Sequence, residues 1–344
     1  MSLRAVMAGC GQQARQWVRA ARDVGGIEII GLADIDPGAA QTLATEADLN
    51  GVRVGTDLGE LLDETAPDLL FDIVVPDARR DVVAAGLSHG AHVLSEKPMA
   101  TSLDEAREIV ALGRTANRVH AIVQNRRYVE GIRRLQGLVA SGAIGELTAL
   151  HCDFFVGPHF GGFREEMDHP LLLDMAIHTF DAARLISGRN PRSVLCEEFN
   201  PAGSWYAHAA SANALFTLDD GAVFTYRGSW CAEGLPTSWE GSWRLIGTRG
   251  SATWDGADAY AAEQVTGVDA FLASTRPIDV PQLSDASCAE GHASVLREFV
   301  GAIRGGTRPE THAEDNIRSL AMVLAAIESA ETGHRVTIEQ ELAA

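Results

Sequence analysis

A single lysine stands out among the residues that could do chemistry. The chain has 344 residues, and of its 28 Lys and Arg residues all but Lys97 are arginine. Lysine differs from arginine because its ammonium group is a compact point charge whose pKa falls readily on burial. A composition that uses arginine almost everywhere therefore marks Lys97, in Ser95-Glu96-Lys97-Pro98, as a candidate for proton chemistry. The plain alternative is a surface lysine kept by chance.

A carboxylate and an imidazole form the second candidate pair. Asp174 and His178 are four residues apart in a segment, 171–185, with a helical apolar pattern. On a helix both side chains project from one face. A carboxylate beside an imidazole orients the ring and raises its basicity, as a general base requires. The alternative is a buried structural pair, and Asp181 could pair with His178 instead.

A glycine-rich turn near the N-terminus predicts a nucleotide site. Gly9-Cys10-Gly11-Gln12-Gln13-Ala14 follows an apolar run and opens a helical pattern. Gly9 permits the tight turn, Gly11 lets the backbone approach a pyrophosphate, and Ala14 allows close helix–strand packing. Gln12 and Gln13 would offer free N–H groups at the positive end of the helix. A glycine-rich turn with no nucleotide is the alternative.

The nature of the nucleotide is indicated by Asp34, which lies at the end of the next strand pattern. A carboxylate there accepts hydrogen bonds from the adenine ribose hydroxyls and repels a 2′-phosphate. Ile35 and Asp36 supply no arginine that would attract such a phosphate. We therefore expect NAD rather than NADP, with Asp34 and Ile35 at its ribose.

The first part of the chain alternates strand-like and helix-like segments. Strands are expected at 5–8, 27–33, 52–54, 69–75, 92–95 and 119–123, and helices at 12–24, 38–47, 58–64, 81–89 and 102–117. This alternation predicts a doubly wound parallel sheet, in which ligands bind beyond the carboxyl ends of the strands. We expect residues 1–123 to form a Rossmann dinucleotide-binding domain with Lys97 at that edge.

After residue 123 the pattern changes. A helix is expected at 129–141 and another at 313–329, with long strand-like stretches at 147–156, 194–199, 212–218, 222–230, 242–246 and 251–254. Residues 255–285, rich in Asp, Ala, Ser and Pro, are expected to be mostly loop. The sequence predicts an α/β domain at 124–344, with a large open, mainly antiparallel sheet, for substrate binding and oligomerisation.

Composition excludes several classes of partner. The formal charge of −19 argues against nucleic acid and anionic membranes, which need a basic face. No apolar run is long enough to span a bilayer, and the N-terminus leaves no room for a leader, so we expect a cytoplasmic protein. Five dispersed cysteines form no metal signature, and His159, His169, Asp174 and His178 match no metal motif, so no metal is expected.

Taken together, these motifs resemble those of the Gfo/Idh/MocA oxidoreductases, which include inositol dehydrogenases and glucose–fructose oxidoreductase. The resemblance covers nearly the whole chain. It is carried by 9–14, Ala33-Asp34, Val74-Val75-Pro76, Glu96-Lys97-Pro98, Asn125-Arg126-Arg127-Tyr128, Asp174…His178 and 329–333. It implies a Rossmann domain followed by an α/β domain whose open sheet packs on another subunit, giving a homodimer or homotetramer.

The resemblance also implies roles for individual residues. Lys97 matches the catalytic lysine that binds the reacting oxygen, His178 the general base, and Asp174 the acid that orients the histidine and contacts substrate. The resemblance places Val75, Pro76, Glu96 and Lys97 at the cofactor and Arg127 and Tyr128 at the substrate, with a cis bond before Pro98. The implied reaction oxidises a secondary hydroxyl of a small sugar or cyclitol by hydride transfer to NAD(P).

Three departures limit what the resemblance says about substrate. Val75 stands where Thr or Ser is usual, and Arg80 where His is common. A bulky segment, 168–173, replaces the usual glycine-rich stretch before Asp174. Residues 154–169 are rich in Phe, Gly, His and Arg, so we expect them to border the pocket and His159 and Arg164 to bind substrate. The alternative is a loop packed on its own aromatic rings.

Two other functions remain open. An NAD-using glycosidase would oxidise the ring transiently, eliminate the aglycone and reduce the ring again, with no net NADH. A non-catalytic nucleotide sensor would use the same Rossmann domain. The presence of Lys97, Asp174 and His178 together argues against the sensor, because a sensor needs no acid–base groups.

Overall fold

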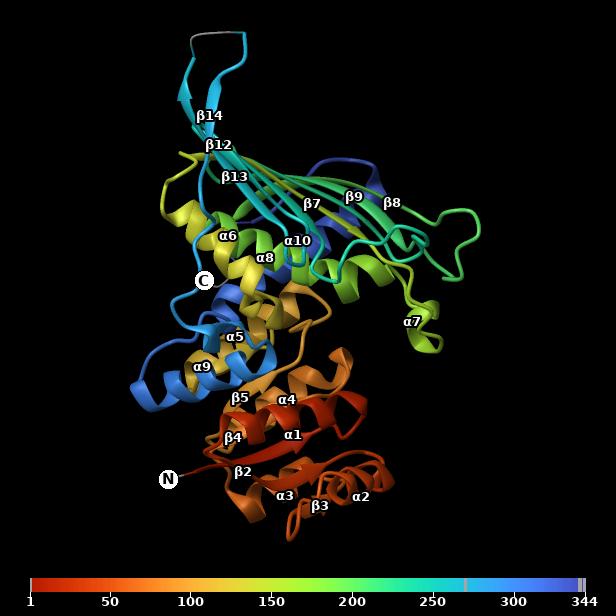
Figure 1. The fold of residues 1–344 in the computed structure, drawn as a ribbon. Helices are drawn as coiled ribbons and strands as arrows, with labels where there is room; N and C mark the ends of the chain where they lie inside the picture. The colour runs from red at the N-terminus through yellow and green to blue at the C-terminus, as the bar shows by residue number, and fades with distance from the viewer. Residues whose placement is uncertain (1, 269–270, 340–341, 343–344) are drawn as a thin grey trace. The chain divides into compact units, whose positions relative to one another are not determined.

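The computed structural model describes residues 2–268, 271–339 and 342, which form two compact units (Figure 1). The first unit contains the chain up to Asn125, together with Glu290–Leu320 and Leu342. The second contains Arg126–Ala289 and the chain from Ala321. The two units are therefore not consecutive stretches of the chain, because residues 290–320 return to the first unit.

The first unit is built on a six-stranded parallel sheet with the strand order β3-β2-β1-β4-β5-β6. Its strands are β1 (Leu3–Ala8), β2 (Ile27–Ala33), β3 (Arg53–Gly55), β4 (Leu69–Asp72), β5 (His92–Ser95) and β6 (His120–Ile122). Its helices are α1 (Gln12–Val24), α2 (Pro37–Glu46), α3 (Leu58–Thr65), α4 (Pro76–Ser88), α5 (Leu103–Ala116) and α9 (His292–Gly305). This order confirms the predicted doubly wound fold, with its switch point between β1 and β4.

Apolar strands and capped helices explain these elements. All four residues of β4 are buried, as expected of a central parallel strand covered on both faces. The side chain of Asp36 accepts a hydrogen bond from Gly38 N at the start of α2, and Ser102 accepts one from Glu105 N at the start of α5. The Trp17 ring of α1 lies 5.2 Å from the Phe71 ring of β4 and fixes the helix on the sheet.

One boundary differs from the prediction. The strand expected at 69–75 ends at Asp72, and the helix expected at 81–89 begins at Pro76. Proline suits the first helical position because its φ is preset and its missing N–H would be unpaired there. Residues 73–75 are thus a short turn, and this turn borders the site described below.

The second unit is built on a nine-stranded sheet with the order β14-β13-β12-β11-β7-β10-β9-β8-β15. The strands are β7 (Leu147–Phe155), β8 (Pro191–Phe199), β9 (Ser211–Leu218), β10 (Val223–Ser229), β11 (Ser242–Gly247), β12 (Gly250–Trp254), β13 (Tyr260–Gly267), β14 (Ser274–Pro277) and β15 (Val336–Thr337). Only the β7–β10 pair is parallel, which confirms the mainly antiparallel prediction. The expected loop at 255–285 was wrong in part, since β13 and β14 extend the sheet by successive antiparallel pairing.

Helical segments complete the second unit: η1 (Asn125–Tyr128), α6 (Glu130–Ala140), α7 (Phe163–Glu166), η2 (Leu171–Ala176), α8 (Ile177–Ser187) and η3 (Ala286–Ala289), with α10 (Ala313–Thr332) shared by both units. Phe180 of α8 makes edge contacts with Phe216, Phe224 and Tyr226 of the sheet, at 4.8–6.0 Å between ring centroids. This aromatic core fixes α8 across the sheet. Among the described residues, no helix is both long and apolar enough to cross a membrane.

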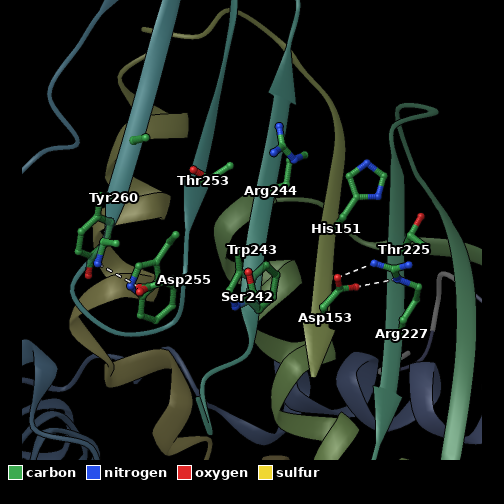
Figure 2. Close-up of a pocket in the computed structure, with 13 residues that line it drawn as sticks. His151, Asp153, Thr225, Arg227, Ser242, Trp243, Arg244, Thr253, Asp255 and Tyr260 are labelled. Carbon is green, nitrogen blue, oxygen red and sulfur yellow. Dashed lines mark hydrogen bonds and ion pairs between the residues drawn. The ribbon is translucent and has the colours of Figure 1, made fainter. Parts of the chain in front are cut away.

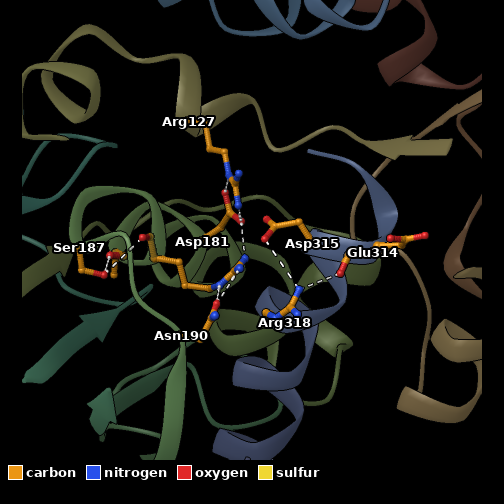
Figure 3. Close-up of polar contacts among 9 residues, drawn as sticks. Arg127, Asp181, Ser187, Asn190, Glu314, Asp315 and Arg318 are labelled. Carbon is orange, nitrogen blue, oxygen red and sulfur yellow. Dashed lines mark hydrogen bonds and ion pairs between the residues drawn. The ribbon is translucent and has the colours of Figure 1, made fainter. Parts of the chain in front are cut away.

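A buried ion pair joins η1 to α8. Arg127 donates two hydrogen bonds, of 2.6 and 2.8 Å, to the Asp181 carboxylate, and both side chains are at most 6% exposed (Figure 3). Arg184 lies 3.8 Å from the same carboxylate and also bonds Asn190. Because buried charges need a partner, this cluster constrains how η1 and α8 pack.

Removing Asp181 should destabilise the protein strongly. Asp181→Ala removes the carboxylate that holds the buried Arg127 guanidinium, and we expect a loss of about 3–5 kcal/mol in the free energy of unfolding. Arg107→Ala, which breaks an exposed ion pair with Asp104, should cost about 1 kcal/mol or less. Urea unfolding followed by tryptophan fluorescence measures both. Equal losses in the two variants would contradict the role given to the buried pair.

Candidate functional site

A pocket of about 320 Å³ lies at the carboxyl ends of the strands of the first unit. The ends of β1 and β2, the turns that follow β1 to β4, the start of α3 and the first two turns of α4 all contribute. Its lining residues are Ala8, Gly9, Gly11, Ala33, Asp34, Ile35, Thr56, Leu58, Ile73, Val74, Val75, Ala78 and Val82. The sequence singled out the glycines, Asp34, Ile35 and Val75. Thr56, Ile73 and Val74 were missed, although each follows a strand whose carboxyl end the topology places at this edge.

The glycine turn leaves space for a phosphate. Gly9 has a φ of +93°, and a Cβ there would lie 2.7 Å from the carbonyl carbon and oxygen of Ile73, so no larger residue fits. A Cβ at Gly11 would meet nothing within 4 Å. Gly11 caps α1 without a side-chain hydrogen bond, and the first turn, from Gln12, has no acidic residue. Free N–H groups at an open helix N-terminus suit an anion such as a pyrophosphate.

Asp34, which also lines this pocket, is fixed by backbone donors. Its Oδ2 accepts a 2.7 Å hydrogen bond from Cys10 N, and its Oδ1 accepts a 2.9 Å bond from Asp36 N. Each carboxylate oxygen keeps a lone pair for a further donor such as a ribose hydroxyl. No arginine or lysine lines the pocket. The residues present therefore fit a dinucleotide such as NAD.

Lys97 follows β5 and is joined to Pro98 by a cis peptide bond. Glu96, beside it, is held inside the unit. Its Oε1 accepts a 2.7 Å hydrogen bond from Trp17 Nε1 and lies 3.7 Å from His292 Nε2. Burial alone would raise the pKa of Glu96. A hydrogen bond and charge from His292, together with the hydrogen bond from Trp17, hold this pKa below its usual value. The anionic Glu96 thus anchors the segment that carries Lys97.

His292 was not foreseen from the sequence. It begins α9, and its Nδ1 lies 3.0 Å from Gln16 Nε2 and 3.4 Å from Asn125 Nδ2. These contacts connect α1, α9 and the first residue of η1 around Glu96. No local pattern announces the contact, because His292 returns to the first unit from a distant part of the chain.

In the second unit, Asp174 and His178 lie on one continuous helical segment of mixed geometry. Asp174 belongs to η2, a π-helix rather than the predicted α-helix, and His178 lies in the first turn of α8. π-Helical turns are rare and often occur at functional sites.

Asp174 is paired with Arg164, one of the predicted substrate residues. Arg164 Nε donates a 2.8 Å hydrogen bond to Asp174 Oδ2. The same guanidinium lies over the rings of Phe160 and Phe163, at 5.2 and 4.9 Å. Residues 154–169 therefore provide an aromatic and cationic border next to Asp174. Because a guanidinium group has five N–H donors, Arg164 can bind Asp174 and still donate to other acceptors.

His178 shares a small cavity with Arg126, Trp239 and Glu240. Arg126 and Glu240 form an ion pair, and Trp239 remains 42% exposed. The sequence favoured Arg127 and Tyr128 instead, but both are buried, and Arg127 is held by Asp181. That geometry favours a structural role for Arg127 over a substrate contact and brings Arg126 to His178.

The remaining histidines of this region have other neighbours. His159 stacks on Trp205 with 3.8 Å between ring centroids, and its Nε2 lies 3.0 Å from Glu233 Oε1. His169, at a φ of +50°, pairs with the nearly buried Glu198. Within 2–268, 271–339 and 342, no group of three or more His, Cys, Asp or Glu residues could hold a metal.

Comparison with known proteins assigns both halves of the chain. Residues 3–124 match the model of the oxidoreductase family with an NAD-binding Rossmann fold, and residues 132–253 match the GFO/IDH/MocA C-terminal domain. The 1,5-anhydro-D-fructose reductase of Ensifer adhaerens is 25% identical over 343 residues, covering 97% of this chain and 98% of the reductase. The D-apiose dehydrogenase of Paraburkholderia graminis is 23% identical over 342 residues, covering 96% of this chain and 88% of the dehydrogenase.

A solved structure shares the fold along the whole chain. An oxidoreductase from Agrobacterium radiobacter, in complex with NAD⁺, L-tartaric acid and magnesium, superposes with a TM-score of 0.86 at 23% identity. The match covers 98% of each chain. With the two family models, it agrees with the glycine turn, the parallel sheet and the nine-stranded sheet described above. The chain belongs to the Gfo/Idh/MocA family of oxidoreductases.

Proposed function

We propose that this oxidoreductase is an NAD-dependent dehydrogenase that oxidises a secondary hydroxyl of a sugar, cyclitol or related carbohydrate. One observation carries the proposal: the only lysine of the chain comes just after Glu96 at the carboxyl end of β5, a strand of the same sheet whose carboxyl edge bears the dinucleotide-type pocket. The relatives named as acting on anhydrofructose and apiose support the substrate class.

Each proposed catalytic group has a distinct task. His178 accepts the proton of the reacting hydroxyl, and Asp174, on the preceding turn, keeps the imidazole oriented. The Lys97 ammonium group stabilises the charge that develops on the substrate oxygen. Bound NAD supplies a hydride acceptor at its nicotinamide ring. Arg164 and the rings of Phe160 and Trp239 would hold the sugar, since aromatic faces and directed polar groups suit carbohydrates.

Residues of the first unit would bind the cofactor. Gly9, Gly11, Gln12 and Gln13 would hold the pyrophosphate at the N-terminus of α1, and Asp34 and Ile35 would meet the adenine ribose. Val75, Pro76, Glu96 and Lys97 would border the nicotinamide half. The preference for NAD over NADP rests on the carboxylate of Asp34 and on the lack of arginine in the pocket lining.

A substrate panel tests the proposal. The protein is incubated with NAD or NADP and a set of inositols, aldoses, deoxysugars, anhydrosugars and sugar acids, and absorbance is followed at 340 nm. Net NADH from one subset supports a dehydrogenase. No NADH, with aglycone release from aryl glycosides that requires NAD, would favour transient oxidation by a glycosidase instead.

The acid–base groups should be essential for turnover. With the panel compound that the wild type oxidises best, Lys97→Ala and His178→Ala should each lower kcat by about 10²-fold or more. His334→Ala, which removes an exposed imidazole whose Nδ1 lies 2.6 Å from the Thr332 carbonyl, is the matched control and should keep full turnover. Circular dichroism checks folding. Full activity in either Lys97→Ala or His178→Ala would overturn the assignment.

The cofactor preference should depend on Asp34. Asp34→Ala removes the acceptor for the ribose hydroxyls and the charge that repels a 2′-phosphate, so NAD binds more weakly and NADP relatively better. Titration calorimetry with both cofactors measures the ratio of their Kd values. Asp23→Ala, an exposed carboxylate on α1 outside the pocket, should leave that ratio unchanged. An unchanged ratio in Asp34→Ala would refute the ribose role.

We further infer that the outer face of the nine-stranded sheet binds a second copy of the chain. This face carries a groove of about 790 Å³, whose lining includes His151, the Asp153–Arg227 ion pair and Arg244 (Figure 2). Leu195, Leu215 and Ile246, from β8, β9 and β11, are 36–41% exposed. Apolar side chains around an open polar groove suit an interface between subunits.

Charge on this face should dissociate the proposed oligomer. The double variant Leu215→Glu/Ile246→Glu places like charges in an interface that would otherwise bury apolar side chains, so it should sediment as a monomer. Sedimentation velocity compares it with the wild type, which should form a dimer or tetramer. A monomeric wild type, or an unchanged mass in the variant, would contradict the interface.

A further inference from the structure

A buried polar cluster in the first unit has no part in the proposed chemistry. It consists of Asp72 at the end of β4, Arg79 in α4, Ser95 at the end of β5 and His120 in β6. The side chains of Arg79 and Asp72 are 1% and 0% exposed. Burying a charged pair is costly unless its hydrogen bonds are well satisfied, so such a cluster calls for a reason.

The guanidinium of Arg79 joins three separate segments. Its Nε donates a 2.9 Å hydrogen bond to Asp72 Oδ2, and its Nη2 donates a 2.6 Å bond to the Val74 carbonyl. Its Nη1 donates to the carbonyl of Pro98. One side chain thus connects the end of β4, the turn that follows it and the segment after β5. The planar fork of arginine serves three acceptors in fixed directions, which the single ammonium group of lysine does not.

The remainder of the cluster fixes Asp72 as the anchor of this fork. Val74 N donates a 3.3 Å bond to Asp72 Oδ1, and the nearby Ser95 hydroxyl helps to keep the pKa of this carboxylate down. Burial lowers the pKa of His120 to about 3, so its imidazole, 3.0 Å from Ser95 Oγ, is neutral. Burial raises the pKa of Asp72, and the charge of Arg79 opposes that rise.

The two carbonyls held by Arg79 belong to the segments that would meet one half of the cofactor. Val74 and Val75 line the dinucleotide pocket, and Pro98 is the cis partner of Lys97. The neighbouring Arg80 makes exposed ion pairs, with Asp81 and Glu108. Arg79 therefore differs from its neighbour in joining a lining segment to the lysine segment.

We propose that Arg79 is a positioning residue that holds the Val74–Val75 turn and the Lys97–Pro98 segment in the spacing needed to receive the nicotinamide half of NAD. This inference rests on the proposed function. It assigns Arg79 no contact with cofactor or substrate. It predicts that disturbing the fork affects the nicotinamide half of the cofactor and spares the adenosine half.

The test compares NADH with ADP-ribose, which lacks only the nicotinamide. In Arg79→Lys the charge opposite Asp72 remains, but both carbonyls cannot be held together. We expect the Kd for NADH, from titration calorimetry, to rise about tenfold or more, the scale of a lost charge-assisted hydrogen bond. The Kd for ADP-ribose should stay within the error of the titration. The emission enhancement of bound NADH, which reports the surroundings of the nicotinamide, should fall in parallel.

Matched variants keep the test decisive. Arg80→Lys should leave both Kd values unchanged. If Arg79→Lys does not fold, Asp72→Asn, which keeps the shape of the anchor but removes its charge, should shift the NADH value alone. Equal weakening of both ligands, or no change in either, overturns the positioning role while the proposed function stands. A wild type that binds neither ligand overturns both.

Discussion

The carboxyl ends of parallel strands must meet along one edge of a sheet, and the chemistry of the first unit depends on this constraint. The turn after β1 supplies Gly9, that after β2 supplies Asp34, that after β4 supplies Val74, and that after β5 supplies Lys97. Residues far apart in sequence thereby share one edge. The carboxyl ends of β1, β2, β4 and β5 are buried, so these ends have little freedom to move and hold the turns that follow them in place.

The sheet of the second unit is covered differently, since helices lie on one of its faces and the other face is open (Figure 1). Phe180 locks α8 onto the aromatic core of the covered face, and the Arg127–Asp181 pair joins η1 to the same helix. These contacts determine where the segment with Asp174 and His178 lies in the unit. The Arg164–Asp174 pair then brings the aromatic border of residues 154–169 to that segment. Packing on the covered face thus positions the proposed catalytic and substrate-binding groups.

Much of this arrangement follows from local sequence signals. Apolar runs and glycine and capping residues predict the Rossmann sheet, and residue type and spacing single out Lys97 and the Asp174–His178 pair. The features that the sequence did not reveal depend on long-range contacts. Strands β13 and β14 form by pairing along a sheet edge, and His292 reaches Glu96 from a distant segment. Arg79 resembles its exposed neighbour Arg80 in sequence and differs from it only because the fold buries it. The π-helix at Asp174 likewise has no compositional signature.

The proposed mechanism requires the only lysine of the chain to face the nicotinamide half of the cofactor. Protein grown with lysine carbon-13-labelled at Cε gives one lysine resonance, that of Lys97, in a carbon–proton correlation spectrum. We predict that saturating NAD⁺ moves this resonance further than saturating ADP-ribose, because only the nicotinamide distinguishes the two ligands. Saturation is verified by tryptophan fluorescence. Identical shifts with both ligands, or none with NAD⁺, would contradict the assignment of Lys97 to the reaction.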